Sequence, residues 1–170
     1  MPVNLELKIK VASHSKLKKL LSEIRAERRG ILNQEDVYYK HKSGLLKLRT
    51  ENGNESLIHY QREEKKSNRW SDFSYIKFKD RGSRKFFDKI FKQEIIVQKR
   101  RELFFYDNTR IHLDTVKSLG KFVELETLVI NGKADAKKRF DKIIKLLGLD
   151  NCQEIRKSYR DLMIGLQRNK

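Results

Sequence analysis

Charged residues occupy every second position in five stretches of the chain, with apolar residues between them. In the clearest stretch, Val3–Val11, five aliphatic residues alternate with polar ones that include Glu6 and Lys8. Near the other end of the chain, Glu124 and Glu126 share a face in the same way. Because side chains two residues apart on a strand point in the same direction, each stretch predicts a β-strand with one charged face and one apolar face.

The charged faces are sorted by sign from strand to strand. The first strand combines an acid with a base, the last carries paired acids, and strands between them carry basic pairs such as Lys47 with Arg49 and Lys99 with Arg101. For any one strand, a charged face that simply meets water is the more frequent explanation. Several strands sorted in this way favour a polar-lined barrel that surrounds an anion and a metal ion.

The remaining pattern predicts one α+β domain over residues 1–170. Strands are predicted at 3–11, 31–39, 45–50, 56–62, 71–79, 94–105, 110–116 and 121–130. Leu17, Leu20 and Ile24 recur at helical spacing and predict a helix that runs to about residue 28, and a short helix is predicted at 83–92. Two C-terminal helices, within about 133–168, are expected to pack on the barrel; the second is predicted to include Ile155 and Tyr159.

Composition narrows the class of protein only in part. The 40 basic residues against 23 acidic ones give a net charge of +17, which attracts polyanions but also suits a lysine-rich, well-solvated surface. The single cysteine, Cys152, excludes an internal disulfide framework and fits a reducing cytosol. No apolar run approaches membrane-spanning length and no cleavable signal precedes the first strand. We therefore expect a cytoplasmic protein without a membrane partner.

The polar faces hold the candidate chemistry. Burying any of these charged groups alone is costly, whereas together they can line a wet tunnel. Guanidinium groups bind phosphate oxygens in pairs and lysines act as point charges, while carboxylates are ligands for Mg²⁺ or Mn²⁺. Phosphoryl chemistry requires little beyond positioning, a metal and charge neutralisation. The residues are Glu6, Lys8, Lys47, Arg49, Arg62, Lys99, Arg101, Arg110, His112, Asp114, Glu124 and Glu126.

Other chemistry is weakly supported. His112 is compatible both with a general base and with a structural hydrogen-bond partner. His14, His41 and His59 have no ligand-like spacing with one another or with Cys152, which argues against a zinc site among them. The chain also lacks a Gly-rich phosphate loop and a nucleophile elbow.

Short motifs follow one another along nearly the whole chain. The first strand reads Asn4-Leu5-Glu6-Leu7-Lys8, and a later one reads Gln34-Glu35-Asp36-Val37-Tyr38. After them come Leu46-Lys47-Leu48-Arg49, Arg110-Ile111-His112-Leu113-Asp114, Val123-Glu124-Leu125-Glu126 and Ser158-Tyr159-Arg160-Asp161-Leu162. In this order they resemble the CYTH superfamily, the triphosphate tunnel metalloenzymes, and in particular its class IV adenylyl cyclase branch. The resemblance implies an eight-stranded antiparallel β-barrel with flanking helices that binds a triphosphate and a divalent cation, Mg²⁺ or Mn²⁺.

The resemblance also implies roles for single residues. It implies that Glu6, Glu124 and Glu126 are metal ligands and that Asp114, Glu6 and Lys99 are catalytic residues. Triphosphate binding falls to Lys8, Lys47, Arg49, Arg62, Lys99, Arg101 and Arg110. Two positions depart from the family pattern: the first acid of the opening motif is Asn4, which removes one charge from the metal site, and the usual Arg-x-Arg pair is Lys47-x-Arg49.

Three functions stay open on the sequence. The resemblance favours a metal-dependent class IV adenylyl cyclase that converts ATP to cyclic AMP and pyrophosphate. The second is a triphosphatase that hydrolyses inorganic triphosphate, thiamine triphosphate or nucleoside triphosphates in the same tunnel. The third is a non-catalytic polyanion or RNA binder that uses the +17 charge, although nucleic acid is not expected as the main ligand. The oligomeric state, monomer or homodimer, is also open.

Overall fold

The architecture is an antiparallel β-barrel with helices on its outer face. The computed structural model describes residues 3–62, 70–79 and 82–168. The strands are β1 (Val3–Val11), β2 (Glu27–Tyr39), β3 (Leu45–Glu51), β4 (Asn54–Arg62), β5 (Trp70–Lys77), β6 (Gln93–Tyr106), β7 (Thr109–Val116) and β8 (Gly120–Leu128). The helices are α1 (Ser15–Glu23), α2 (Ser83–Ile90), α3 (Lys133–Leu146) and α4 (Tyr159–Arg168).

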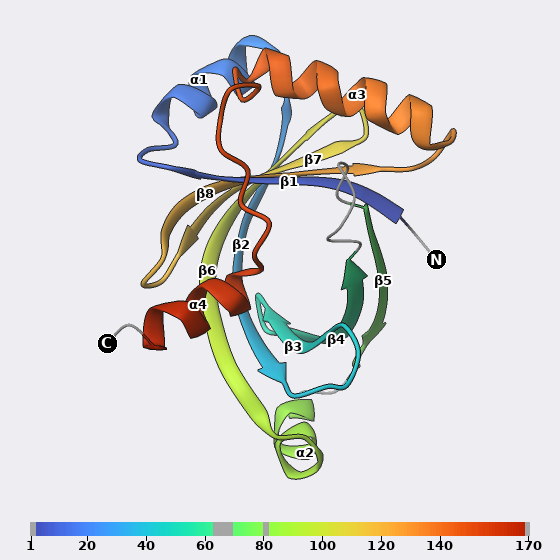
Figure 1. Cartoon of the computed structure of the whole chain (residues 1–170), viewed down its shortest axis with the longest axis vertical. Coiled ribbons are helices and arrows are strands. Elements are labelled where there is room, and N and C mark those ends of the chain that lie inside the picture. The colour runs from blue at the N-terminus through green and yellow to red at the C-terminus, as the bar shows by residue number, and fades with distance from the viewer. Residues whose placement is uncertain (1–2, 63–69, 80–81, 169–170) are drawn as a thin grey trace.

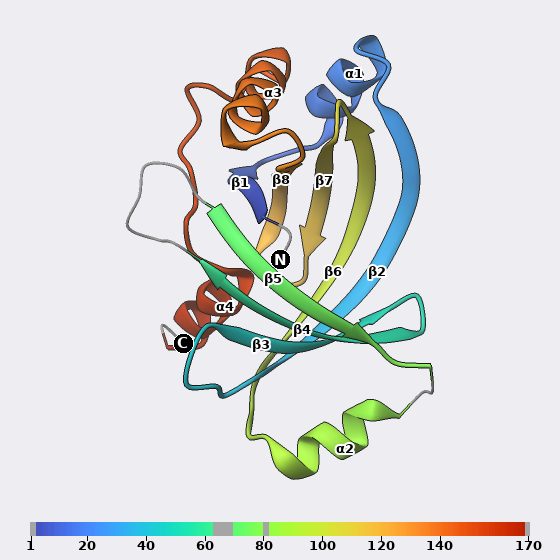
Figure 2. The same cartoon turned by 90° about the vertical axis from the view of Figure 1, so that its right-hand side faces the viewer.

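The eight strands of the described residues close into a barrel in the order β1-β5-β4-β3-β2-β6-β7-β8 (Figure 1, Figure 2). Every neighbouring pair is antiparallel, and β1 closes the barrel by pairing with β8 along its whole length. The predicted α+β class with an eight-stranded antiparallel barrel is confirmed. No helix among the described residues has the length and apolar character needed to cross a membrane.

The alternation of the strands places their apolar faces outside and their polar faces inside. Leu5 and Ile9 of β1 are buried against α1 and α3, in one cluster with Leu21 and Ile143. Helices α1 and α3 lie side by side over β1 and β7 (Figure 1, Figure 2). Because the helices cover the apolar face, the charged face of each strand is left to line the interior.

Two smaller apolar clusters cover the rest of the barrel. Phe87 of α2 packs on Val37 and Leu48 at the end of the barrel opposite α1 and α3 (Figure 2). Tyr159, the first residue of α4, packs on Phe122, with ring centroids 5.1 Å apart. Helix α4 thereby places an aromatic ring in the lining of the barrel interior.

The structure differs from the sequence-based element boundaries at two places. Helix α1 ends at Glu23 instead of near residue 28, because Arg25 takes a left-handed conformation with φ of 55° and β2 begins at Glu27. Ile155 lies before α4 instead of within it, and its backbone N–H donates to the carbonyl of Lys8 at 2.8 Å. The described pairing of β1 with β5 ends at Leu5. Beyond that point the segment before α4 forms backbone hydrogen bonds with the edge of β1 that β5 leaves open.

Candidate functional site

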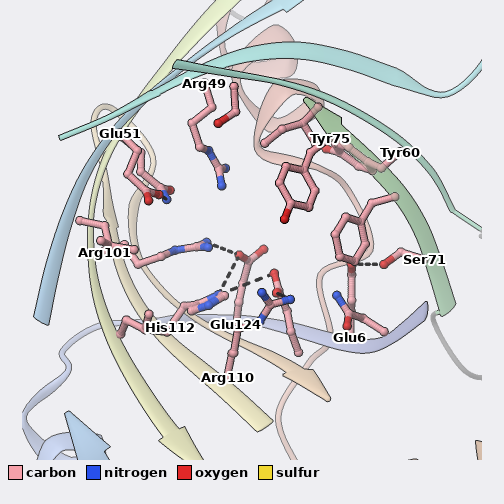
Figure 3. Close-up of a pocket in the computed structure, with 18 of the residues that line it drawn as sticks. Glu6, Arg49, Glu51, Tyr60, Ser71, Tyr75, Arg101, Arg110, His112 and Glu124 are labelled. Atoms are coloured by element: carbon pink, nitrogen blue, oxygen red, sulfur yellow. Dashed lines mark hydrogen bonds and ion pairs between the residues drawn. The ribbon is translucent and has the colours of Figure 1, made fainter. Parts of the chain in front are cut away.

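The barrel interior holds a cavity of about 690 Å³ that is lined by the charged strand faces. Figure 3 shows Arg49 on one side of it and Glu124, His112 and Glu6 on the other. The side chain of Arg62, also predicted to bind triphosphate, lies outside what the structure describes. The predicted residues that line the cavity are Glu6, Lys8, Lys47, Arg49, Lys99, Arg101, Arg110, Glu124 and Glu126.

One fully buried carboxylate, Asp36, binds three cations on one side of the cavity. Its oxygens accept hydrogen bonds from Lys47 at 2.9 Å, from Lys99 at 3.1 Å and from two nitrogens of Arg49 at 2.7 and 2.8 Å. The strand register explains the contact with Arg49, since Asp36 on β2 lies directly opposite Arg49 on β3. Burial alone would raise the pKa of Asp36, but the three cations hold it well below its usual value.

This group, the Asp36 cluster, carries more positive than negative charge. Burial is the largest influence on both lysines and lowers the pKa of Lys47 and of Lys99. Both side chains are almost completely inaccessible, so water does little to screen the repulsion between them. An anion that entered the cavity would favour the charged form of each lysine.

Asp114 does not line the cavity and holds Arg101 from behind. It is fully buried, and its two oxygens accept from Nε and Nη2 of Arg101 at 2.7 and 2.6 Å. The hydroxyl of Tyr159 donates to the same carboxylate at 2.9 Å. The sequence resemblance implied a catalytic place for Asp114, which stays a prediction; the structure shows Asp114 orienting Arg101.

Three potential metal donors meet on the opposite wall of the cavity. His112 on β7 lies directly opposite Glu124 on β8, and donor atoms of His112, Glu124 and Glu126 all lie within 4.8 Å of one another. Two carboxylates and an imidazole are a donor set that fits a divalent cation. We call these three residues the His112 group.

Glu6, which the resemblance placed with the two other acids, lies outside the His112 group. Its carboxylate accepts a hydrogen bond from the hydroxyl of Ser71 on β5. Glu6 nevertheless lies directly opposite Glu126 on β8 and lines the same cavity, so the ligand set of Glu6, Glu124 and Glu126 stays a prediction beside the His112 group.

The charged states within the His112 group follow from its neighbours. Burial raises the pKa of Glu124, but Lys8 at 3.1 Å and Arg101 at 2.6 Å hold it well below its usual value. Burial likewise opposes ionisation of Glu126, yet its charged neighbours lower the pKa of Glu126 to about 2. Burial, reinforced by Arg101, lowers the pKa of His112 to about 4. At neutral pH the group thus holds two carboxylates and a neutral imidazole.

The remaining wall of the cavity is aromatic. Phe73 and Tyr75 on β5 stack with ring centroids 6.5 Å apart, and Tyr60 on β4 lies nearby (Figure 3). The ring of Tyr75 points into the cavity and is 54% exposed, which is unusual for a large aromatic residue of a barrel interior (Figure 3). This wall offers an apolar surface beside the charged ones.

Sequence reasoning missed Asp36 and Tyr159 as parts of the site. Asp36 lies in one of the motifs that resemble the family, but only its position opposite Arg49 shows that its carboxylate binds several cations. The ring of Tyr159 lies 4.0 Å from the Lys8 ammonium and 5.3 Å from that of Lys99, which are cation–π contacts from a helix distant in the sequence. An aromatic residue within a predicted helix gives no signal for such a contact.

Comparisons with known proteins agree with this architecture. A Methanocaldococcus jannaschii protein named as a candidate adenylate cyclase is 26% identical, over 94% of this chain and 98% of its own length. A Pyrococcus horikoshii structure superimposes with a TM-score of 0.81 at 24% identity, covering 94% of this chain and 98% of that one.

A structure from Hippeastrum, described as a candidate adenylyl cyclase with a dominant triphosphatase activity, has a TM-score of 0.70 at 14% identity and covers 97% of this chain and 96% of its own. At these identities the two structures indicate the shared fold alone. The family model of the CYTH domain, however, matches residues 3–159, which span the eight strands of the described barrel, helix α3 and the segment that leads to α4. The chain therefore belongs to the CYTH domain family.

Proposed function

We propose that this protein is a metal-dependent enzyme that acts on a nucleoside triphosphate inside the barrel, by the adenylyl cyclase reaction that converts ATP to cyclic AMP and pyrophosphate. The observation that carries the proposal is that one cavity combines the Asp36 cluster, the His112 group and an aromatic wall. CYTH tunnel enzymes are in general metal-dependent and are adenylyl cyclase-like or triphosphatases. These features match the three parts of such a substrate: phosphates, bound metal and base.

The cations are arranged to hold a phosphate chain. Lys47, Arg49 and Lys99 point from the Asp36 cluster into the cavity and are oriented by hydrogen bonds to one carboxylate. Arg101, whose Nε and Nη2 are fixed by Asp114, adds a further guanidinium charge to the cavity lining. Because these groups are held before the ligand arrives, little reorganisation is needed when charge develops in the reaction.

In the proposed reaction the ribose 3′-oxygen forms a bond to the α-phosphorus while the bond from that phosphorus to the bridging oxygen breaks. The oxygen and its electron pair leave with pyrophosphate, whose charge the Asp36 cluster stabilises, and the hydroxyl proton is released. Glu124 and Glu126 would hold the divalent ion, which would supply charge neutralisation for the phosphates. Tyr75 and Phe73 stack with the base and thereby fix the ribose.

A triphosphatase is the second candidate function. The same cavity is large enough to hold water beside a triphosphate, and a water in place of the ribose oxygen turns the reaction into hydrolysis. The Hippeastrum neighbour described as having a dominant triphosphatase activity has the same fold. Both reactions use the same cations and the same metal donors.

Product identification tests the proposal directly. The purified chain is incubated with ATP, inorganic triphosphate or thiamine triphosphate, each with Mg²⁺ or Mn²⁺, and the products are separated by chromatography. Cyclic AMP with pyrophosphate supports the cyclase, whereas orthophosphate with a shortened chain supports the triphosphatase. A protein that forms no product from any substrate and binds nucleic acid with a steep salt dependence would be the polyanion binder instead.

Removing one interior cation should separate binding from folding. Lys99→Ala is expected to weaken the binding of inorganic triphosphate at least about tenfold, because Lys99 is a buried charge that faces the cavity. The melting temperature without ligand should hold or rise, since the Asp36 cluster keeps two cations for its single carboxylate. Calorimetric titration and thermal shift measure the two effects.

The matched control is Lys89→Ala, which removes the same charge from the exposed surface of α2. It should bind inorganic triphosphate as the parent protein does. Equal stabilisation of the parent and the Lys99→Ala protein by triphosphate would mean that the anion binds elsewhere.

A further inference from the structure

We infer that His112 is itself a ligand of the divalent cation, and that the His112 group selects a transition ion such as Mn²⁺ over Mg²⁺. The inference deepens the proposed function. It rests on one part of that proposal, namely that the site binds a metal ion. It differs from the all-carboxylate set that the sequence resemblance implied, in which Glu6 was the third ligand.

The positions of the donor atoms carry the first step. Nδ1 of His112 lies 3.7 Å from Oε1 of Glu126 and 4.0 Å from Oε2 of Glu124. Two donors bound to one ion at about 2.1 Å are at most about 4.2 Å apart, twice the bond length. Both distances satisfy this limit, and both are too long for a hydrogen bond. A shared cation between these atoms therefore fits where a direct contact does not.

The imidazole nitrogen has no other use in the described structure. His112 is 4% exposed, and its Nδ1 is among the few buried side-chain atoms of the described residues that make no hydrogen bond. A buried polar atom without a partner destabilises the folded protein, because it has lost its hydrogen bonds to water. A cation at Nδ1 would remove that destabilisation, because it supplies the missing partner of the lone pair.

The carboxylates available for a metal are reduced in this chain. The first acid of the opening motif is Asn4, so β1 contributes the carboxylate of Glu6 alone to the cavity. The imidazole of His112 reaches the same wall from β7 and provides a third donor beside Glu124 and Glu126. A nitrogen donor thus stands where an oxygen donor is lacking.

The identity of the donors determines the preferred ion. Mg²⁺ favours oxygen ligands and releases its water reluctantly, whereas imidazole binds Mn²⁺, Co²⁺ and Zn²⁺ with rising affinity along the transition series. Replacing one carboxylate by an imidazole therefore weakens the site for Mg²⁺ more than for a transition ion. Mn²⁺ is the most informative probe, since it accepts both oxygen and nitrogen and is paramagnetic.

Electron paramagnetic resonance of bound Mn²⁺ tests the inference without turnover. The full chain is titrated with MnCl₂, with and without inorganic triphosphate, and the bound fraction is examined for nitrogen coupling. We expect a nitrogen signal in the parent protein and its loss in His112→Gln, with Mn²⁺ affinity reduced at least about tenfold. Mg²⁺, measured by its competition with Mn²⁺, should lose much less affinity in the same variant.

Two further variants make the result decisive. His41→Gln changes an exposed histidine outside the cavity and should leave both the signal and the affinity unchanged. His112→Asp restores a carboxylate, so it should bind Mn²⁺ without nitrogen coupling and bind Mg²⁺ more tightly than the parent does. The loss of nitrogen coupling and the tighter Mg²⁺ binding in His112→Asp test the inference even if His112→Gln folds poorly. Circular dichroism monitors the fold of each variant.

The outcomes separate this inference from the proposed function. A parent protein whose bound Mn²⁺ shows no nitrogen coupling, or that binds no Mn²⁺ in either condition, would overturn the role of His112 even if ATP is turned over. Nitrogen coupling in a parent protein that cyclises and hydrolyses nothing would keep the metal site and refute the enzyme. Unchanged coupling in His112→Gln would identify another nitrogen as the ligand and overturn the inference.

Discussion

Asp36→Asn is expected to destabilise the free protein by about 3–5 kcal/mol, and inorganic triphosphate should recover much of that loss. Asp36 is the anion that Lys47, Arg49 and Lys99 share, so its removal leaves three buried cations without their counter-charge. A bound polyanion supplies that charge from outside the chain. Urea denaturation with and without triphosphate measures both parts of the effect.

The control for Asp36→Asn is Asp141→Asn, which breaks an exposed pair between Asp141 and Lys137 on α3. It should change the free energy of unfolding by no more than about 0.5 kcal/mol, and triphosphate should not alter the difference. If triphosphate stabilised Asp36→Asn less than it stabilises the parent, the Asp36 cluster would not be the phosphate site.

Glu124→Gln is expected to reduce turnover by roughly 10²–10³-fold while changing metal-free triphosphate binding far less. The substitution keeps the shape of the side chain but removes a charge from the His112 group. It also removes the anion that competes with phosphate for Lys8 and Arg101. Steady-state kinetics with Mn²⁺ measure the turnover, and calorimetry in the presence of a chelator measures the metal-free binding of triphosphate.

Glu35→Gln provides the matched control for that variant. Glu35 lies on β2 but points to the outer surface, where it binds Arg84 and Gln98. Its loss should leave turnover within about twofold of the parent, since surface substitutions change little. Full turnover in Glu124→Gln would show that the acids only balance the interior cations.

Much of the barrel was predictable because a strand has a period of two. Once Glu6, Lys8, Lys99 and Glu124 are on the polar faces of strands, the pleat of the strands predicts that their side chains point in a common direction. The need to bury the apolar faces predicts that helices cover them. The signs of the charges then indicated the anion and metal chemistry. These inferences need only local spacing.

The site details depend on pairings that local spacing does not determine. The role of Asp36 requires that β2 pair with β3 in one register, and the hydrogen bond from Ser71 to Glu6 requires that β5 reach β1. His112 becomes a metal donor only because β7 aligns it with Glu124. Ile155 kept the apolar spacing of a helix, but the open edge of β1 bound its backbone instead.

The order of synthesis gives the pairing of β1 with β8 a further consequence. The ribosome makes Lys8 before Glu124 and before Lys157, whose carbonyl accepts from the Lys8 ammonium and which lies 149 residues further along the chain. Barrel closure therefore waits until β8 has been synthesised, and contacts between such distant residues form slowly. Until then the edge of β1 is open to strands of other chains. The protein is most exposed to aggregation while it is being translated, and chaperone binding to β1 at that stage would protect it.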